Sequence, residues 1–372
     1  MAEFATIPGL QRVASRLRCA RETFGRIDTM MRRLFINWLL AAFTGLFAAP
    51  LAAQTPEEFY AKKQIRMLVG FGPGTGNDLY MRVLARHLGK HIPGHPVIVP
   101  ENMPGAASLG MINYLYNAAA RDGSVIGMPS RNLLVEPLFG NPQARFKASE
   151  FSWLGSMSRD TALCFTWHTS GIRTLDDAKR QDVLVGSTGQ ASNSFFFPRL
   201  LNTLFGTRFK PIIGYPDSGA IGIAMERGEL QGYCSFTLAA IRSARPQWLA
   251  DREINVLVQM TLRPNPDLPN IPAVTDLIGN PADARLLALV LADQEMGRPL
   301  AGPPGMPGER VQALRAALEE VVSDADFLAD ARKSGVDVDG PIGGEAVAKI
   351  VNELYATPRE IVERVKALRE GS

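Results

Sequence analysis

Two segments of the chain, one in each half, place a loop of small polar residues directly after an apolar run and before a helical pattern. In the first, the run 64–71 leads into the loop 72–78 and a helix expected over 79–89. In the second, the run 183–186 leads into the loop 187–193. Strand, tight turn and helix in this order open an α/β unit, and such folds bind ligands at helix N-termini beyond the strand ends. The sequence therefore predicts two candidate ligand loops.

The same alternation of strands and helices continues along the chain, which indicates mostly parallel sheets. Prolines at 264, 266, 269 and 272 exclude regular structure there. Further strands are expected over 96–100, 162–167, 231–236 and 254–260, and further helices over 108–120, 174–179, 195–204, 221–227 and from 308 onward.

Length and composition fit a globular protein of two domains: the chain has 372 residues, 46% hydrophobic and 21% charged. The net charge of +3 arises at the N-terminus, because residues 1–53 carry +4 and the remainder carries −1. A nearly neutral body lacks the clustered basic face that nucleic acid requires. We expect no nucleic-acid partner.

The N-terminal segment has the order of a secretory signal peptide. Met31-Arg32-Arg33 precedes the apolar run 34–49, and small residues follow up to Ala53, where we expect cleavage. The run is short for a membrane span, although a retained N-terminal anchor is the alternative. Residues 1–29 fit neither role, so we expect translation to start at Met30 or Met31. The mature protein is then periplasmic and begins near Gln54.

Three cysteines are present, and Cys19 lies in the segment expected to be lost. Cys164 and Cys234 remain in a chain whose compartment permits disulfides. A bridge between them would stabilise the fold by about 4 kcal/mol in the chain-entropy model. Two buried thiols in strands are the alternative.

One helix N-terminus supplies only about 0.3 to 2 kcal/mol to anion binding, whereas micromolar affinity requires about 8 kcal/mol. Two loops that face each other across a closing cleft could supply the difference. The pair of loops therefore favours a two-lobed binding protein.

Other motifs in the chain give weaker support for nucleotide binding, metal binding or hydrolysis. Phe71 to Asp78 resembles a dinucleotide loop, but Asn77 stands at the third glycine position and Pro73 removes an N–H group. His87, His91 and His95 have metal-like spacing, but Pro93-Gly94 interrupts the helix, which favours surface residues. No nucleophile motif for hydrolysis is present. The aromatic residues 195–197 and Tyr215 are either core or ligand contacts.

These residues resemble the periplasmic solute receptors of tripartite tricarboxylate transporters, the TctC or Bug family, over about residues 60–360. The chain departs from the pattern of this family at a few positions, which are Gly72, Thr75, Met103 and Ala107-Ser108. The matching positions are Phe71, Pro73, Gly74, Gly76 and Asp78 in the first loop, Glu101, Asn102, Pro104, Gly105 and Ala106 in the second signature, Asp122-Gly123, the loop 186–193, the segment 215–228 and the segment 266–272.

The resemblance implies an α/β, two-lobed type II periplasmic binding protein fold, a Venus flytrap with mostly parallel sheets and two chain crossings. Lobe 1 would comprise 54–160 and 261–372, and lobe 2 would comprise 161–260. It also implies a monomeric receptor, not an enzyme, that carries a small carboxylate to membrane transporter subunits. We expect no cofactor or metal. A secreted hydrolase and a binding module for a sensor are the alternatives.

The resemblance assigns ligand contacts to both loops and gives Asp78 a role in loop organisation or in binding a ligand donor group. The predicted ligand-binding residues are Phe71, Gly72, Gly74, Thr75, Gly76, Asn77, Asp78, Ser187, Thr188, Gly189, Ala191, Ser192, Asn193 and Tyr215.

Overall fold

The computed structural model describes residues 54–190 and 192–370. By its internal contacts the chain from Thr55 onward forms one unit, and the fold below is that of this unit. The predicted signal peptide and the translation start lie outside the described residues. Within the described part, no helix has both the length and the apolar character needed to cross a bilayer.

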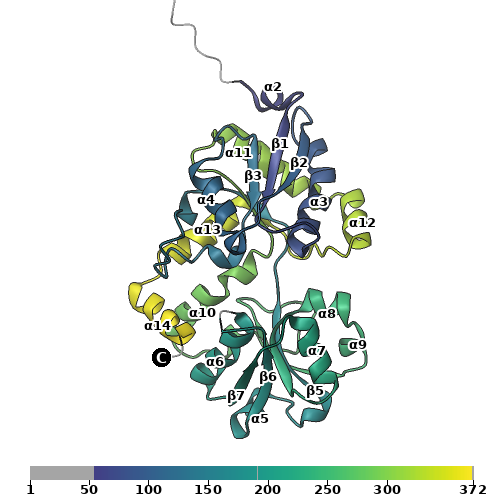
Figure 1. Ribbon diagram of the computed structural model, residues 1–372, viewed down its shortest axis with the longest axis vertical. Helices are drawn as coiled ribbons and strands as arrows, with labels where there is room; N and C mark the ends of the chain where they lie inside the picture. The colour runs from purple at the N-terminus through teal and green to yellow at the C-terminus, as the bar shows by residue number, and fades with distance from the viewer. Residues whose placement is uncertain (1–53, 191, 371–372) are drawn as a thin grey trace, which may run out of the picture. The chain divides into compact units, whose positions relative to one another are not determined.

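The strands form two sheets (Figure 1). The first sheet has the order β11-β4-β10-β3-β1-β2, and the second has the order β7-β6-β8-β5-β9. Strands of the first sheet are β1 (Gln64–Val69), β2 (Val97–Asn102), β3 (Val125–Met128), β4 (Ser152–Ser156), β10 (Pro299–Gly302) and β11 (Ile342–Gly343). Strands of the second sheet are β5 (Ala162–Trp167), β6 (Val183–Ser187), β7 (Phe209–Ile213), β8 (Gly232–Thr237) and β9 (Ile254–Met260).

Helices flank both sheets, and α14 contacts both α10 and α6, so that the C-terminal helix links the two halves. The α-helices are α2 (Pro56–Tyr60), α3 (Gly76–Leu88), α4 (Leu109–Asn117), α5 (Leu175–Arg180), α6 (Asn193–Phe205), α7 (Ser218–Glu226), α8 (Leu238–Ala244), α9 (Gln247–Ala250), α10 (Pro281–Leu291), α11 (Gly308–Val321), α12 (Ala325–Lys333), α13 (Gly344–Tyr355) and α14 (Arg359–Glu370). Short 3-10 turns are η1 (Gly89–His91), η2 (Ala106–Ser108), η3 (Arg131–Leu133), η4 (Ala148–Glu150), η5 (His168–Ser170), η6 (Val274–Leu277) and η7 (Ala292–Glu295).

Both sheets are mixed, which corrects the expectation of mostly parallel sheets. In the first sheet β1 is parallel to β2 and β3, whereas β10 is antiparallel to β3 and β4. In the second sheet β6 is parallel to β7 and β8, whereas β5 is antiparallel to β8 and β9. β11 is also antiparallel to β4. The direction of a pairing is set by contacts between segments that are distant in the chain, and a local alternation of strands and helices does not encode it. The α/β class and the two-lobed fold are as predicted; the lobe boundaries stay a prediction.

The aromatic residues after the second loop belong mainly to the core. Phe196 is 4% exposed and Phe197 is fully buried, and both join a cluster that includes Leu200 of α6. Tyr215 is partly buried against a second cluster around Trp248. Packing therefore accounts for Phe196 and Phe197, the first of the two interpretations left open by the sequence.

A disulfide joins Cys164 of β5 to Cys234 of β8, near the centre of the second sheet. The two residues are register partners, and their Cα atoms are 3.8 Å apart, below the separations of 4.4 to 6.8 Å that disulfides usually show. The register shifts at this point, since Leu163 pairs with Phe236 while Cys164 pairs with Cys234. Ser235 is thus left unpaired as a β-bulge with φ of 125°.

The turn after β2 holds ordinary residues in backbone conformations that favour glycine. Ser108 has φ of 86° and Ala106 has φ of 44°. Ser108 is completely buried and its Oγ has no hydrogen-bond partner. A Cβ on Gly70 would lie 1.9 Å from that Oγ, so Gly70 makes room for the serine.

We expect the substitution Ser108→Gly to raise the free energy of unfolding by about 1 kcal/mol. It removes the left-handed backbone penalty and an unsatisfied hydroxyl, and these gains exceed the added entropy of glycine in the unfolded chain. Urea unfolding measures the change. Ala356→Gly is the control, because Ala356 has φ of −86° and glycine should destabilise there. A stability decrease of similar size in both variants would contradict the expectation.

Candidate functional site

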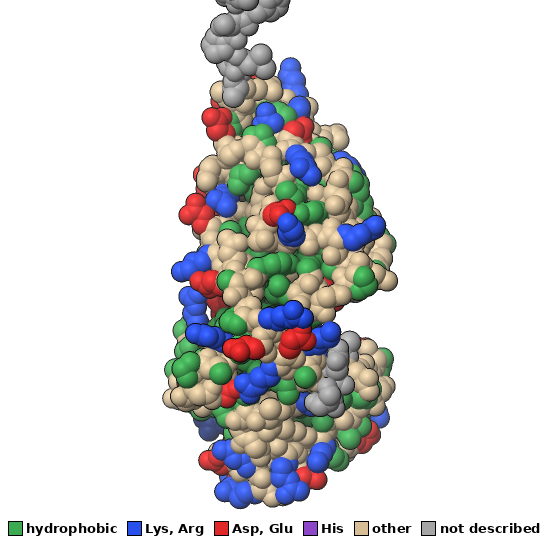
Figure 2. Space-filling model, turned by 90° about the vertical axis from the view of Figure 1, so that its left-hand side faces the viewer, with side chains coloured by type: hydrophobic (Ala, Val, Ile, Leu, Met, Phe, Trp, Pro, Cys, Tyr) green, Lys and Arg blue, Asp and Glu red, His purple; other side chains and the backbone are tan. Residues whose placement is uncertain are grey.

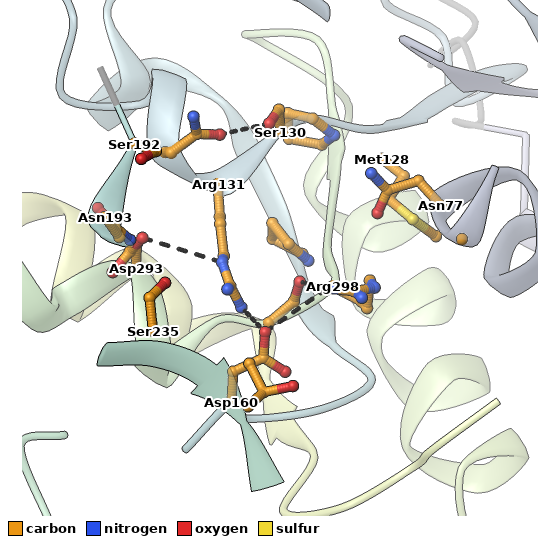
Figure 3. A pocket seen from close by; sticks show the side chains of 16 residues that line it. Asn77, Met128, Ser130, Arg131, Asp160, Ser192, Asn193, Ser235, Asp293 and Arg298 are labelled. Carbon is orange, nitrogen blue, oxygen red and sulfur yellow. Dashed lines mark hydrogen bonds and ion pairs between the residues drawn. The ribbon is translucent and has the colours of Figure 1, made fainter. Parts of the chain in front are cut away.

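A cavity of about 500 Å³ lies between the two sheets (Figure 3). It is bordered by the N-termini of α3 and α6, by the segment that follows β3, by the β4–β5 connection, by β8 and by the stretch from η7 to the start of β10. Its lining residues are Gly76, Asn77, Met128, Pro129, Ser130, Arg131, Asn132, Asp160, Ser192, Asn193, Ser235, Thr237, Asp293, Gly297, Arg298 and Pro299. The volume suits a small organic ligand.

The N-terminus of α3 is held in place by Thr75 and Asp78. Thr75 is the N-cap, and its Oγ1 accepts a hydrogen bond from the Asp78 N–H group. The Asp78 carboxylate accepts hydrogen bonds from the Gly74 N–H group at 2.8 Å, from Arg82 Nε and from Asn102 Nδ2. Gly76 and Asn77 are the first two residues of the helix, so their N–H groups have no intrahelical partners.

Asp78 therefore organises the first loop. Its side chain is nearly buried. Burial acts to raise the pKa of Asp78, but the hydrogen bonds from Arg82, Asn102 and Gly74 outweigh it and hold the pKa below its usual value. The carboxylate stays charged in the folded protein, and its two oxygens are occupied by the loop itself.

The second loop uses several of its own donors internally. The Thr188 N–H group donates to Ser194 Oγ at 3.2 Å, and the Gly189 N–H group donates to Ser187 Oγ at 3.3 Å. Ser192 is the N-cap of α6, so Asn193 is the first helical residue, and its N–H group has no intrahelical partner. The donor that this loop presents to the cavity is therefore at Asn193 rather than at Thr188.

Two arginines and two aspartates form the charged part of the wall. Arg131 lies between Asp160, to which it donates a hydrogen bond, and Asp293, whose Oδ2 is 3.9 Å from Arg131 Nε (Figure 3). Arg298 Nη1 lies 3.8 Å from Asp160 Oδ2, and its guanidinium is 4.4 Å from the centroid of the Tyr80 ring. Burial alone would lower the pKa of Arg131, but Asp160 and Asp293 raise it above its usual value.

The β-bulge beside the disulfide brings Ser235 into the cavity wall, with Thr237 two residues further along β8. Bulges re-aim side chains and occur often next to functional sites. Strain of this kind, at a serine with positive φ, persists where the surrounding structure holds it, and here the disulfide joins the two strands one residue away.

The structure brings four of the predicted ligand residues to the cavity: Gly76, Asn77, Ser192 and Asn193. Ala191 lies outside the described residues. The others do not border the cavity: Phe71, Gly72, Gly74, Thr75, Asp78, Ser187, Thr188, Gly189 and Tyr215.

The charged wall was not predicted from the sequence. Arg131 had a local signal, because the apolar residues 125–128 are followed by Pro129-Ser130-Arg131-Asn132, the same pattern as in the two predicted loops. Asp160, Asp293 and Arg298 had none, since Asp160 and the stretch that holds Asp293 and Arg298 are far apart in the chain. Among the described residues, no three His, Cys, Asp or Glu side chains are grouped so as to hold a metal ion.

No family model matches the chain. One curated protein, from Cupriavidus necator and described as a UPF0065 protein in the gbd 5′ region, is 39% identical over 82 residues. The match spans 22% of this chain and only 24% of that relative.

Solved structures share the fold over nearly their whole length. A TctC solute-binding protein from Polaromonas is 18% identical, with a TM-score of 0.65 over 82% of this chain and 99% of that one. An R. palustris protein with adipate is 18% identical, with a TM-score of 0.54 over 83% and 97% of the two chains. MatC from Rhodopseudomonas palustris, with bound malate, is 18% identical, with a TM-score of 0.53 over 81% and 99%.

The fold is therefore that of the two-lobed periplasmic binding proteins. The solved structures that share it include a TctC receptor and BugD, which confirms at the level of the fold the resemblance seen in the sequence. They are described as a solute-binding protein and a periplasmic binding protein.

Proposed function

We propose that the chain is a solute receptor of the TctC or Bug type, which binds a small carboxylate in the cavity between its sheets and delivers it to membrane transporter subunits. One observation carries the proposal: the N-termini of two long helices, α3 and α6, border the same cavity. Each offers unpaired N–H groups and the positive end of a helix dipole to an anion. Two helix N-termini that act on one ligand stabilise the bound anion more than either N-terminus does alone.

Comparison with known proteins supports this proposal. The neighbours with adipate and malate have dicarboxylates in a protein of the same fold. The periplasmic neighbours and the signal-like segment 31–53 together support export of this chain, and we propose that it acts as a monomer. On the face shown in Figure 2, basic and acidic side chains are interspersed, without the broad basic region typical of nucleic-acid binding.

Proline at the first helical position tests the two helix ends. Gly76→Pro and Asn193→Pro each remove one N–H group at a position where proline fits a helix, and Thr75 and Ser192 before them are already extended. No atom lies within 4 Å of a Cβ added at Gly76. Loss of one charge-assisted hydrogen bond should weaken binding about ten-fold to a hundred-fold in each variant. Calorimetry with the tightest binder among succinate, malate, glutarate and adipate measures it.

Ala325→Pro is the matched control, because Ala325 is the first residue of α12, is exposed and does not border the cavity. Its affinity should equal that of the parent. Parental affinity in either cavity variant would show that the helix end concerned does not bind the carboxylate. Failure of the parent to bind any of the four acids or their amino derivatives would count against the receptor function itself.

A further inference from the structure

The two aspartates of the cavity wall differ in how completely their carboxylates are paired with cations and hydrogen-bond donors. Asp160 accepts a hydrogen bond from Arg131 and has a second guanidinium, that of Arg298, at 3.8 Å. It is 11% exposed and lies in the connection between β4 and β5. With two cations on one carboxylate, Asp160 has little attraction left for a ligand.

Asp293 interacts electrostatically with Arg131 and Arg369, but neither of them donates a hydrogen bond to it. Its Oδ1 accepts one hydrogen bond, from Gln294 Nε2 at 3.1 Å. Its Oδ2 lies 3.9 Å from Arg131 Nε, which is beyond hydrogen-bond distance. No cation among the described residues donates a hydrogen bond to it. An ionised carboxylate offers about four acceptor positions, and the described residues fill only part of those on Asp293, which borders the cavity.

The direction in which the pKa of Asp293 is shifted agrees with this incomplete pairing. Burial raises the pKa of Asp293, and the attraction of Arg131, the hydrogen bond from Gln294 and the attraction of Arg369 together do not compensate. A carboxylate in this condition gains from a further donor and is destabilised by a further anion. A ligand that is negative at both ends would meet repulsion here, whereas a ligand with a cationic group would supply what the aspartate lacks.

We propose that Asp293 determines specificity by accepting hydrogen bonds from an ammonium group, so that the ligand is a small amino carboxylate rather than a simple dicarboxylate. The inference rests on the proposed function, because the N–H groups of α3 and α6 hold the ligand's carboxylate while Asp293 binds its ammonium group. The charges of the wall support this pairing: two arginines against two aspartates leave the cavity neutral, which suits a ligand that carries both signs.

The test compares ligand pairs that differ only by the amino group: L-aspartate with succinate, L-glutamate with glutarate, and L-2-aminoadipate with adipate. Calorimetry is performed on the parent protein and on Asp293→Asn, which keeps the shape of the side chain and removes its charge. In the best pair, the parent should bind the amino compound at least about ten-fold more tightly, since a charge-assisted hydrogen bond is involved. In Asp293→Asn this preference should disappear, and the dicarboxylate should bind as well as before or better.

The control is Asp182→Asn, which removes a half-exposed charge paired with Arg208 on the surface. It should keep the parental preference. Equal or tighter binding of the dicarboxylates by the parent would overturn the assignment of Asp293 and leave the receptor function standing, and so would a preference unchanged in Asp293→Asn. Absence of binding by both members of all three pairs would overturn both.

Discussion

Replacing Cys164 and Cys234 together by alanine should lower the free energy of unfolding by about 4 kcal/mol. The bridge closes a loop with a sequence separation of 70, and without it the unfolded chain regains conformational entropy worth about that much free energy. Because β5 pairs with β8 and β9 through its backbone, the second sheet should still form. Urea unfolding of the oxidised parent and of the double variant measures the difference.

Treatment of the parent with a reducing agent provides the matching comparison, and it should destabilise the parent but not the double variant. Thiol titration of the oxidised, denatured chain should find Cys19 alone, and none in a chain that begins near Gln54. Two additional thiols would refute the disulfide.

The substitution Arg131→Met should lower the free energy of unfolding by about 3 kcal/mol. It leaves Asp160 without its hydrogen-bonded cation and Asp293 without its nearest guanidinium, and both aspartates are largely buried. Removing one partner of a buried ion pair typically costs 3 to 5 kcal/mol, and the partial exposure of Arg131 places it at the lower end.

A double-mutant cycle separates loss of the pair from loss of packing. Arg131→Met combined with Asp160→Asn removes both charges and should be less destabilised than the sum of the two single variants. Urea unfolding of all four proteins provides the comparison. Strictly additive losses would show that the two side chains do not interact in the folded state.

The strands and helices with clear patterns were predictable because their signals are local. Ala162–Trp167 and Ile254–Met260 have the bounds predicted from their apolar runs. Val125–Met128 and Pro299–Gly302 are fully buried strands of four residues, too short to give a periodic signal. They pair with strands far away in the chain, and for β10 the pairing is antiparallel, which no local pattern encodes.

In the second loop, too, the sequence predicted the local element but not which of its polar groups would be free. Its polar residues correctly indicated a helix N-terminus, but Ser194 Oγ occupies the Thr188 N–H group, so the donor that faces the cavity is shifted to Asn193. Whether a polar group is free for a ligand depends on its partners in the folded loop, and residue types alone do not reveal these.

By itself, the sequence determined the α/β class, the two loops that begin α3 and α6, and the resemblance to periplasmic receptors, because each of these follows from short segments whose residues are neighbours in the chain. Only the tertiary structure decided that both sheets are mixed and that Arg131, Asp160, Asp293 and Arg298 meet in one cavity wall. The physical reason is that charge balance and strand direction depend on contacts between segments that are not neighbours in the chain. These contacts exist only once the two halves have folded.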